Sequence, residues 1–134
     1  SFFHNSLERT CSQHNKKYYP KFKKWCDNYF FLKHRNEARG AGGIFFDYLN
    51  TNNWKKDFNF IKDIGKCFLE TYPKIVKNNV DKKWTKNDRE KLLLKRGRYT
   101  EFNLLYDRGT LFGLKTGGNI DAILMSMPPE AKWL

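Results

Sequence analysis

The chain has 134 residues, of which 17% are aromatic and 30% are charged, so it suits one globular domain and is too aromatic to be disordered. Its 26 Lys and Arg against 14 Asp and Glu give a formal net charge of +12, which favours a polyanionic partner: nucleic acid, anionic lipid or a multiply carboxylated small molecule. The cysteines are odd in number and include no CxxC pair, so neither a disulfide framework nor a zinc ribbon is indicated. No apolar run is long enough to span a bilayer.

The first part of the chain predicts two helices. Phe3, Leu7 and Cys11 recur at four-residue intervals, which is typical of a helix over residues 2–11. Pro20 suits the first turn of a second helix, whose apolar face continues to about Phe31.

The stretch from His34 to Tyr48 differs chemically from its surroundings. It combines a histidine, arginines and carboxylates with three glycines, directly before an apolar run. Residues 44–48 predict a buried strand, with Ile44, Phe46 and Tyr48 on one face and Asp47 on the other. The charged groups have two interpretations: a site for anions, or ion pairs that brace a turn.

Helical signals dominate the middle of the chain. Asn53 is a predicted N-cap for an amphipathic helix that covers a sheet. Its predicted buried stripe consists of Trp54, Phe58, Ile61, Gly65 and Phe68. A further helical stretch is expected over residues 73–80, and Thr85 with Asp88 predicts a capping box for a helix that Gly97 closes.

The period changes to two after Gly97. Residues 98–106 alternate as expected for a strand with polar groups on both faces. A turn over residues 107–109 then leads to a predicted hairpin partner at residues 112–114. Residues 115–119 form a predicted glycine turn, and residues 120–127 suit either a strand or a helix.

Three stretches together resemble a known family. They read YPKFKKWCDNYFF from Tyr19, HRNEARGAGGIFFDY from His34 and RGRYTEFNLLYDRGTLFGLKTGGNIDAILMSMPP from Arg96. Their rare residue types fall in the order found in the oxygen-dependent coproporphyrinogen III oxidases. The chain departs from that family at Tyr48, usually Asp, and at Asn119, usually Arg. The resemblance implies that residues 1–134 are the C-terminal part of a single domain.

The resemblance also implies a fold and an activity. The expected fold is α+β, a flat, mostly antiparallel sheet covered by helices on both faces. The expected reaction is the oxidative decarboxylation of coproporphyrinogen III to protoporphyrinogen IX in haem (porphyrin) biosynthesis. Molecular oxygen is the co-substrate, and no organic cofactor is needed. Relatives are homodimers through a region similar to residues 99–134. We expect a cytoplasmic protein, with the mitochondrial intermembrane space as the alternative.

Candidate site residues follow from the same resemblance. Asp47 is the expected catalytic carboxylate, which contacts the pyrrole N–H groups of the tetrapyrrole. The arginines expected to bind propionates or to brace Asp47 are Arg35, Arg39, Arg98 and Arg108. The expected substrate-binding turn is Gly117, Gly118 and Asn119. In bacterial members a divalent metal, with manganese as the candidate, is bound at the positions of His4 and His34. The family's histidine acid/base belongs to the half outside this span, so we expect the chain alone to be inactive.

Two alternatives of other classes stay open. The first is a catalytically silent fragment that dimerises. The second is a basic module that binds nucleic acid or an anionic membrane, although no segment matches a helix-turn-helix, RRM or zinc finger.

Overall fold

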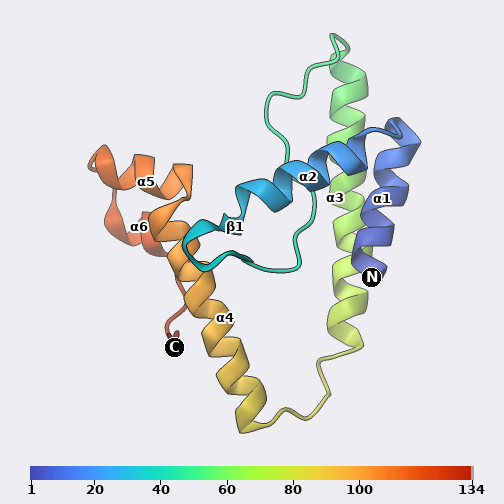
Figure 1. The fold of residues 1–134 in the computed structure, drawn as a ribbon. Helices are drawn as coiled ribbons and strands as arrows, with labels where there is room; N and C mark the ends of the chain where they lie inside the picture. Colours follow the sequence, from blue (N-terminus) through green and yellow to red (C-terminus); the bar gives the residue numbers. More distant parts are fainter. Residues whose placement is uncertain (134) are drawn as a thin grey trace. The chain divides into compact units, whose positions relative to one another are not determined.

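A computed structural model describes residues 1–133. These residues form two compact units. The first unit comprises residues 1–29 and 42–83, and the second comprises residues 30–41 and the described residues from Trp84 onward. Helices dominate both units (Figure 1). None of the helices within residues 1–133 has the length and apolar character needed to cross a bilayer.

Three helices build the first unit: α1 (Phe2–His14), α2 (Tyr18–Tyr29) and α3 (Trp54–Lys77). The predictions of α1 and α2 are confirmed, as is the Asn53 N-cap, whose side chain accepts from the Lys56 N–H. The separate helix predicted over residues 73–80 is wrong, because α3 continues through Pro73 to Lys77. Proline lacks a backbone donor, but the helix around it tolerates that loss at an exposed position.

The core of the first unit lies where α1, α2 and α3 meet. Its buried members are Cys11, Tyr18, Phe22 and Phe60. The ring centroids of Tyr18 and Phe60 are 4.9 Å apart, at the edge-to-face angle that aromatic pairs favour. Figure 1 shows α1 and α3 side by side, so α3 covers a helix rather than the sheet that was predicted.

The strand predicted for residues 44–48 is wrong. Residues 42–53 form no regular element. The backbone N–H of Phe45 donates to the carbonyl of Phe22 in α2 at 3.1 Å, and Phe46 packs against the core. Tyr48 has a φ of 55°, which breaks the alternation, and its side chain is exposed. The apolar run therefore packs against helices, and no strand within residues 1–133 pairs with it.

The buried stripe predicted for α3 is also wrong. The buried residues of α3 are Phe60, Cys67 and Thr71. The predicted stripe lies on another face, where its large side chains Trp54, Phe58, Ile61 and Phe68 are exposed. Helical spacing alone identified an apolar face correctly, but it could not show which of two apolar faces is covered.

The second unit contains a small hairpin and three helices. The hairpin consists of strand β1 (Phe31–Leu32), the 3-10 turn η1 (Lys33–Arg35) and strand β2 (Glu37–Ala38). Its two strands are antiparallel. The helices are α4 (Lys86–Leu105), α5 (Arg108–Lys115) and α6 (Ile120–Leu124). The capping box of Thr85 with Asp88 at the start of α4 is confirmed.

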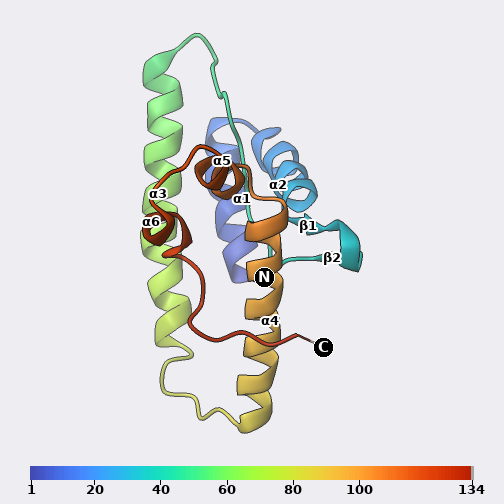
Figure 2. The same cartoon turned by 90° about the vertical axis from the view of Figure 1, so that its left-hand side faces the viewer.

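The strands predicted after Gly97 are wrong. Residues 98–105 continue α4, and residues 112–114 lie in α5. Gly97 does not end the helix; a Cβ at this position would collide with the carbonyl oxygen of Lys132. Figure 2 shows the C-terminal segment crossing α4, where the Lys132 N–H donates to the Leu93 carbonyl at 3.1 Å. The glycine therefore admits a close approach of backbone rather than a stop.

The observed fold agrees with the predicted class in part. The described residues are mostly helical, and their single sheet is the two-stranded antiparallel pair β1 and β2. Such a composition is consistent with part of a domain. A larger sheet covered by helices is not present within residues 1–133, so it stays a prediction for the whole protein.

Candidate functional site

The hairpin of the second unit presents a histidine and an arginine at its tip. Asn36 ends the η1 turn in the left-handed conformation, with φ 51° and ψ 41°, which asparagine tolerates better than most residues. The Arg39 N–H donates to the Phe30 carbonyl at 3.3 Å and closes the base. The backbone conformation of the hairpin therefore fixes the positions from which the His34 and Arg35 side chains project.

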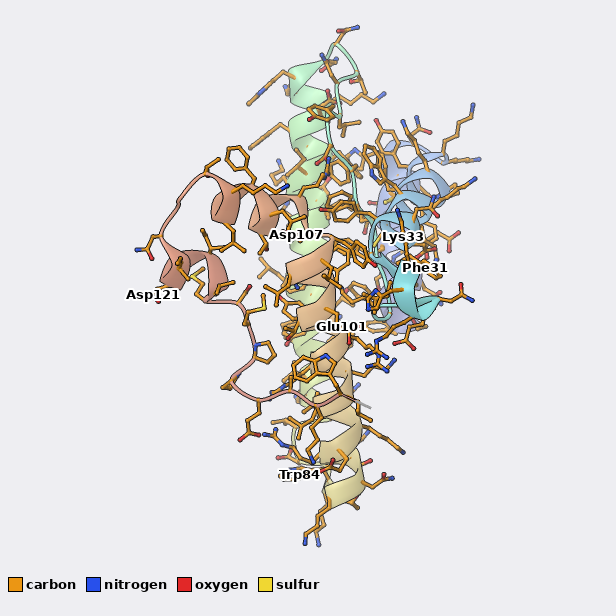
Figure 3. All side chains as sticks on the ribbon, turned by 60° about the vertical axis from the view of Figure 1, so that its left-hand side comes forward. Phe31, Lys33, Trp84, Glu101, Asp107 and Asp121 are labelled. Atoms are coloured by element: carbon orange, nitrogen blue, oxygen red, sulfur yellow. The ribbon has the colours of Figure 1, made fainter. Side chains whose placement is uncertain are left out.

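Glu101 of α4 is the acceptor at the centre of the site. Figure 3 labels it beside Phe31 and Lys33 of the hairpin. The Arg35 Nε and Nη2 donate to its two carboxylate oxygens, each at 2.6 Å. This two-pronged geometry is the strongest arrangement of an arginine with a carboxylate. The Glu101 side chain is only 11% exposed, so the pair joins the hairpin to α4 from a largely covered position.

His34 is held through both ring nitrogens. Its Nε2 lies 2.7 Å from Glu101 Oε2, and its Nδ1 lies 2.8 Å from the Tyr106 hydroxyl oxygen. A carboxylate can only accept, so Nε2 carries the hydrogen and donates. In the neutral ring Nδ1 then accepts from the Tyr106 hydroxyl. The two contacts therefore fix both the tautomer and the ring orientation of His34.

A second ion pair lies along the same face of α4. Arg98 Nε donates to Glu37 Oε1 of the hairpin at 2.6 Å. Arg98 Nη1 is buried and makes no hydrogen bond within the described residues. It lies 3.8 Å from Glu101 Oε1, which is an ion-pair distance but too long for a hydrogen bond. Arg98 therefore donates a hydrogen bond to Glu37, and its positive charge lies close to the Glu101 carboxylate.

The electrostatics of the site favour an ionised Glu101. The hydrogen bonds from Arg35 lower the pKa of Glu101 from the usual 4.5 to about 2, with partial burial opposing them and His34 adding to them. The same contact raises the pKa of Arg35 above its usual value. At neutral pH the carboxylate is therefore charged, and it neutralises one of the two arginines beside it.

Arg39 lies at the base of the hairpin against aromatic rings. Its guanidinium carbon is 4.2 Å from the ring centroid of Phe30, 5.0 Å from that of Phe102 and 5.3 Å from that of Tyr99. A planar guanidinium over ring faces is attracted by their negative quadrupole. The arrangement places a half-buried guanidinium among aromatic rings, of which Phe30 and Tyr99 are partly exposed and Phe102 is fully buried.

Two predicted site residues belong to the first unit instead. Asp47 lies in the irregular segment after Gly43 and is partly buried. His4 lies in the first turn of α1, where its Nδ1 is 3.0 Å from the Tyr19 hydroxyl oxygen. The structure therefore brings His34, Arg35, Arg39 and Arg98 together in one unit and places Asp47 and His4 in the other.

The remaining predicted residues lie at helix ends of the second unit. Arg108 is the first residue of α5. Gly117 has a φ of 72°, a conformation that favours glycine, and the Gly118 N–H donates to the Gly113 carbonyl at 3.0 Å. Asn119 caps α6 through its side chain, which accepts from the Ala122 N–H at 3.2 Å. This turn is exposed, so its backbone is accessible to a ligand.

The two histidines predicted as metal ligands are each hydrogen-bonded to other side chains. Both nitrogens of His34 are already hydrogen-bonded, so a metal ligand there would first have to lose Tyr106 or Glu101. Across residues 1–133 there is no group of three or more His, Cys, Asp or Glu side chains placed to hold an ion. The metal ligands His4 and His34 stay a prediction.

Sequence reasoning missed Glu101, Tyr106 and the role of Glu37. Residues 98–106 were assigned to a strand, in which Arg98 and Glu101 fall on opposite faces. With a helical period, Arg98, Glu101 and Phe102 share one face. That spacing was the available signal. The pairing of this face with residues 34–39 is long-range, and no local pattern encodes it.

Comparisons with known proteins match the chain along its whole length. The family described as Coproporphyrinogen III oxidase matches residues 1–134. The oxygen-dependent coproporphyrinogen-III oxidase of Rickettsia bellii (strain OSU 85-389) is 58% identical over 131 residues, which are 98% of this chain and 47% of the relative. The protein of the same name from Rickettsia africae (strain ESF-5) is 56% identical over the same shares. The chain spans about half the length of the curated relatives that it matches.

Proposed function

Because the chain belongs to the coproporphyrinogen III oxidase family, we propose that it supplies part of the active site of an enzyme that converts coproporphyrinogen III to protoporphyrinogen IX. The enzyme decarboxylates two propionates to vinyl groups and uses molecular oxygen. The observation that carries the proposal is the family match over residues 1–134, together with relatives that are 56–58% identical over 131 residues. The work of the protein in such a reaction is to orient the substrate and to stabilise charge.

The cluster around Glu101 has a positioning role in this proposal. Arg35 and Arg98 are engaged by Glu101 and Glu37, so they brace the hairpin and do not themselves bind propionates. The sequence analysis offered ion pairs that brace a turn as one interpretation of these charged residues. In the proposed role the ion pairs instead join the hairpin to α4. Both arginines hold Arg39 and the aromatic rings beside it at a fixed place.

Arg39, Arg108 and the turn Gly117 to Asn119 are the proposed substrate contacts. The substrate carries carboxylates around an apolar macrocycle, so it needs cations, backbone N–H donors and aromatic walls. Arg39 against the half-buried rings of Phe30 and Tyr99 offers a cation beside aromatic rings. The glycine turn offers accessible backbone, as described above.

Asp47 is the proposed catalytic carboxylate, which contacts the pyrrole N–H groups. The test is Asp47→Asn in a protein that joins this chain to the half of the Rickettsia bellii relative outside the match. Loss of a positioned acid/base group should lower kcat by about two to four orders of magnitude, with little change in tetrapyrrole binding or Tm. If Asp47 only braces an arginine, stability should instead fall by about 3–5 kcal/mol. Near-normal turnover with normal stability would remove Asp47 from the mechanism.

Turnover assays of the chain alone and of the joined protein test the function itself. We expect oxygen-dependent formation of protoporphyrinogen IX by the joined protein and none by the chain alone, since the relatives are about twice its length. A joined protein that folds but lacks turnover would contradict the function. Turnover by the chain alone would contradict the need for the other half. Tight, steeply salt-dependent retention of nucleic acid by the joined protein would instead favour the basic binding module.

Dimerisation is proposed for the region from residue 99 onward. Large apolar side chains are exposed on α5, on α6 and just after α6: Phe112, Leu114, Ile120 and Met125. Apolar patches of this kind mark interaction surfaces. Light scattering of the joined protein should give the mass of a dimer, and Phe112→Glu should convert it to a monomer. A dimer that is unaffected by Phe112→Glu would place the interface elsewhere.

A further inference from the structure

The second unit contains a cavity of about 300 Å³ that is bounded by strand β2 and helix α4. Glu37 lines it from the hairpin, and four residues line it from α4: Lys91, Leu94, Lys95 and Arg98. The three cationic residues follow one another at intervals of four and three residues, so they lie on one side of the helix. A cavity of this volume suits a small molecule, or one arm of a larger molecule.

Positive charge exceeds negative charge in the lining of this cavity. Glu37 is the single carboxylate among the lining residues, and the Nε of Arg98 already donates to it at 2.6 Å. Neither Lys91 nor Lys95 makes a hydrogen bond or an ion pair within residues 1–133. Both lysines are exposed, so their ammonium groups are available to a ligand.

The acids that precede these lysines on α4 are engaged by other groups. Asp88 serves the capping box of the helix, and Glu90 accepts from Lys132 at 2.8 and 2.6 Å. Arg98 adds a further positive group, whose Nη1 is buried and makes no hydrogen bond within the described part of the chain. A negative charge in the cavity would therefore be stabilised by three cations, two of which make no ion pair of their own.

The wall of the cavity is mostly apolar, which restricts the class of ligand. Leu94 is wholly apolar, and each lysine combines an aliphatic stem with its terminal ammonium. Free phosphate would gain nothing from such a wall, and a metal ion would be repelled by the cations. A carboxylate attached to an apolar body matches both properties of the cavity, because its charge pairs with the lysines while its body covers the wall.

We propose that this cavity is a binding site for a carboxylate attached to a small apolar body. Lys91 and Lys95 bind the carboxylate, and Leu94 contacts the body. Arg98 keeps its bond to Glu37 and adds positive charge from the side. Two sources supply this chemistry: a propionate arm of the tetrapyrrole, or a separate small carboxylic acid. Only the first source rests on the proposed function.

Titration of the joined protein with 3-phenylpropionate, followed by ligand-observed NMR, tests the class of ligand. We expect a Kd of about 1 mM, which is typical of a ligand with so few atoms. The alcohol 3-phenylpropanol has the same body without the charge, and inorganic phosphate has charge without the body. Each should bind at least about tenfold more weakly. No binding of 3-phenylpropionate up to about 20 mM, or equal binding of the alcohol or of phosphate, would overturn the proposal.

The double variant Lys91→Gln with Lys95→Gln tests the residues, with Lys86→Gln as the matched control. Lys86 also lies on α4 and is exposed, but it does not line the cavity. The double variant should raise the Kd for 3-phenylpropionate at least about tenfold, whereas Lys86→Gln should leave it unchanged. Circular dichroism checks that each variant is folded. If the double variant unfolds, Lys95→Glu alone should abolish binding and Lys95→Arg, which keeps the charge, should retain it. An unchanged Kd in the folded double variant would refute the site.

Coproporphyrin III, the oxidised and unreactive form of the substrate, distinguishes the two sources. Displacement of 3-phenylpropionate by coproporphyrin III, with weaker porphyrin binding in the double variant, would identify a propionate of the tetrapyrrole as the occupant. Binding of both molecules at once, with no effect of the double variant on the porphyrin, would identify a separate carboxylic acid. Both results keep the site. A lack of turnover by the joined protein would count against the proposed function and leave the titrations with 3-phenylpropionate unaffected.

Discussion

Replacement of Glu101 by glutamine should weaken the second unit more than any other exchange of a carboxylate for an amide on α4. The substitution keeps the shape of the side chain but replaces the charged carboxylate, which accepts hydrogen bonds from Arg35 and His34, with a neutral amide. A fall in pKa from 4.5 to about 2 corresponds to at most about 3–4 kcal/mol of folding free energy. Arg35 is 26% exposed, so solvent screening reduces the expected loss to about 1–2 kcal/mol, or roughly 5–10 °C in Tm.

The pH dependence of that loss has a definite sign. The pKa of Glu101 is lower in the folded state than in the unfolded state, so its contribution is fully present above about pH 4.5. It is lost as the pH falls from about 4.5 towards 2. The Tm difference between the natural chain and Glu101→Gln should therefore be largest near pH 7 and shrink steadily below pH 4.5.

Glu90→Gln is the matched control for this experiment. Glu90 also lies on α4 and accepts from Lys132 at 2.8 and 2.6 Å, but its side chain is 50% exposed. Surface pairs of this kind contribute about 0–1 kcal/mol. The measurement is thermal unfolding followed by circular dichroism between pH 2.5 and 7. Equal Tm losses for the two variants, or a Glu101→Gln loss that does not change with pH, would refute the reasoning.

Two further predictions concern packing and thiol chemistry. Gly97→Ala should destabilise the chain by about 1–3 kcal/mol in urea unfolding, because the new methyl group meets the Lys132 carbonyl. The control Gly65→Ala in α3 places its methyl group in open space and should stabilise the chain by up to about 1 kcal/mol. Stabilisation by both substitutions would contradict the close approach of Lys132 to Gly97. Burial, with a smaller contribution from Cys67, raises the pKa of the Cys11 thiol to about 11. Cys11 should therefore resist a thiol reagent at pH 8 until urea unfolds the chain. Rapid labelling of the folded protein would argue against its burial.

Local signals in the sequence predicted the helix starts well. The Asn53 cap and the capping box of Thr85 with Asp88 each need only residues within one turn, and both are present. The stripe of Phe3, Leu7 and Cys11 likewise identified α1, because a single covered face leaves a single period.

Residues whose environment is set by distant parts of the chain were predicted badly. Residues 98–106 alternate in polarity, but they also carry a helical period, and their contacts with the hairpin favour the helix. Gly97 resembled a helix end, but a glycine is needed there because the backbone of Lys132, far along the chain, approaches it closely. The run of Ile44 to Phe46 has the composition of a buried strand but is covered by helices. In the candidate site, the arginines were identified by residue type, whereas their acceptor Glu101 required knowledge of the tertiary pairing.

The division of the chain into interleaved units has a consequence for its synthesis. The hairpin belongs to the second unit but is made before α3, and 66 residues separate Arg35 from its acceptor Glu101. At about 5–20 residues per second, the ribosome leaves the hairpin without α4 for several seconds. During that time the first unit can fold around the emerging loop, while Leu32 lacks the cover it has in the folded state. The hairpin is therefore exposed to aggregation from its own synthesis until α4 emerges.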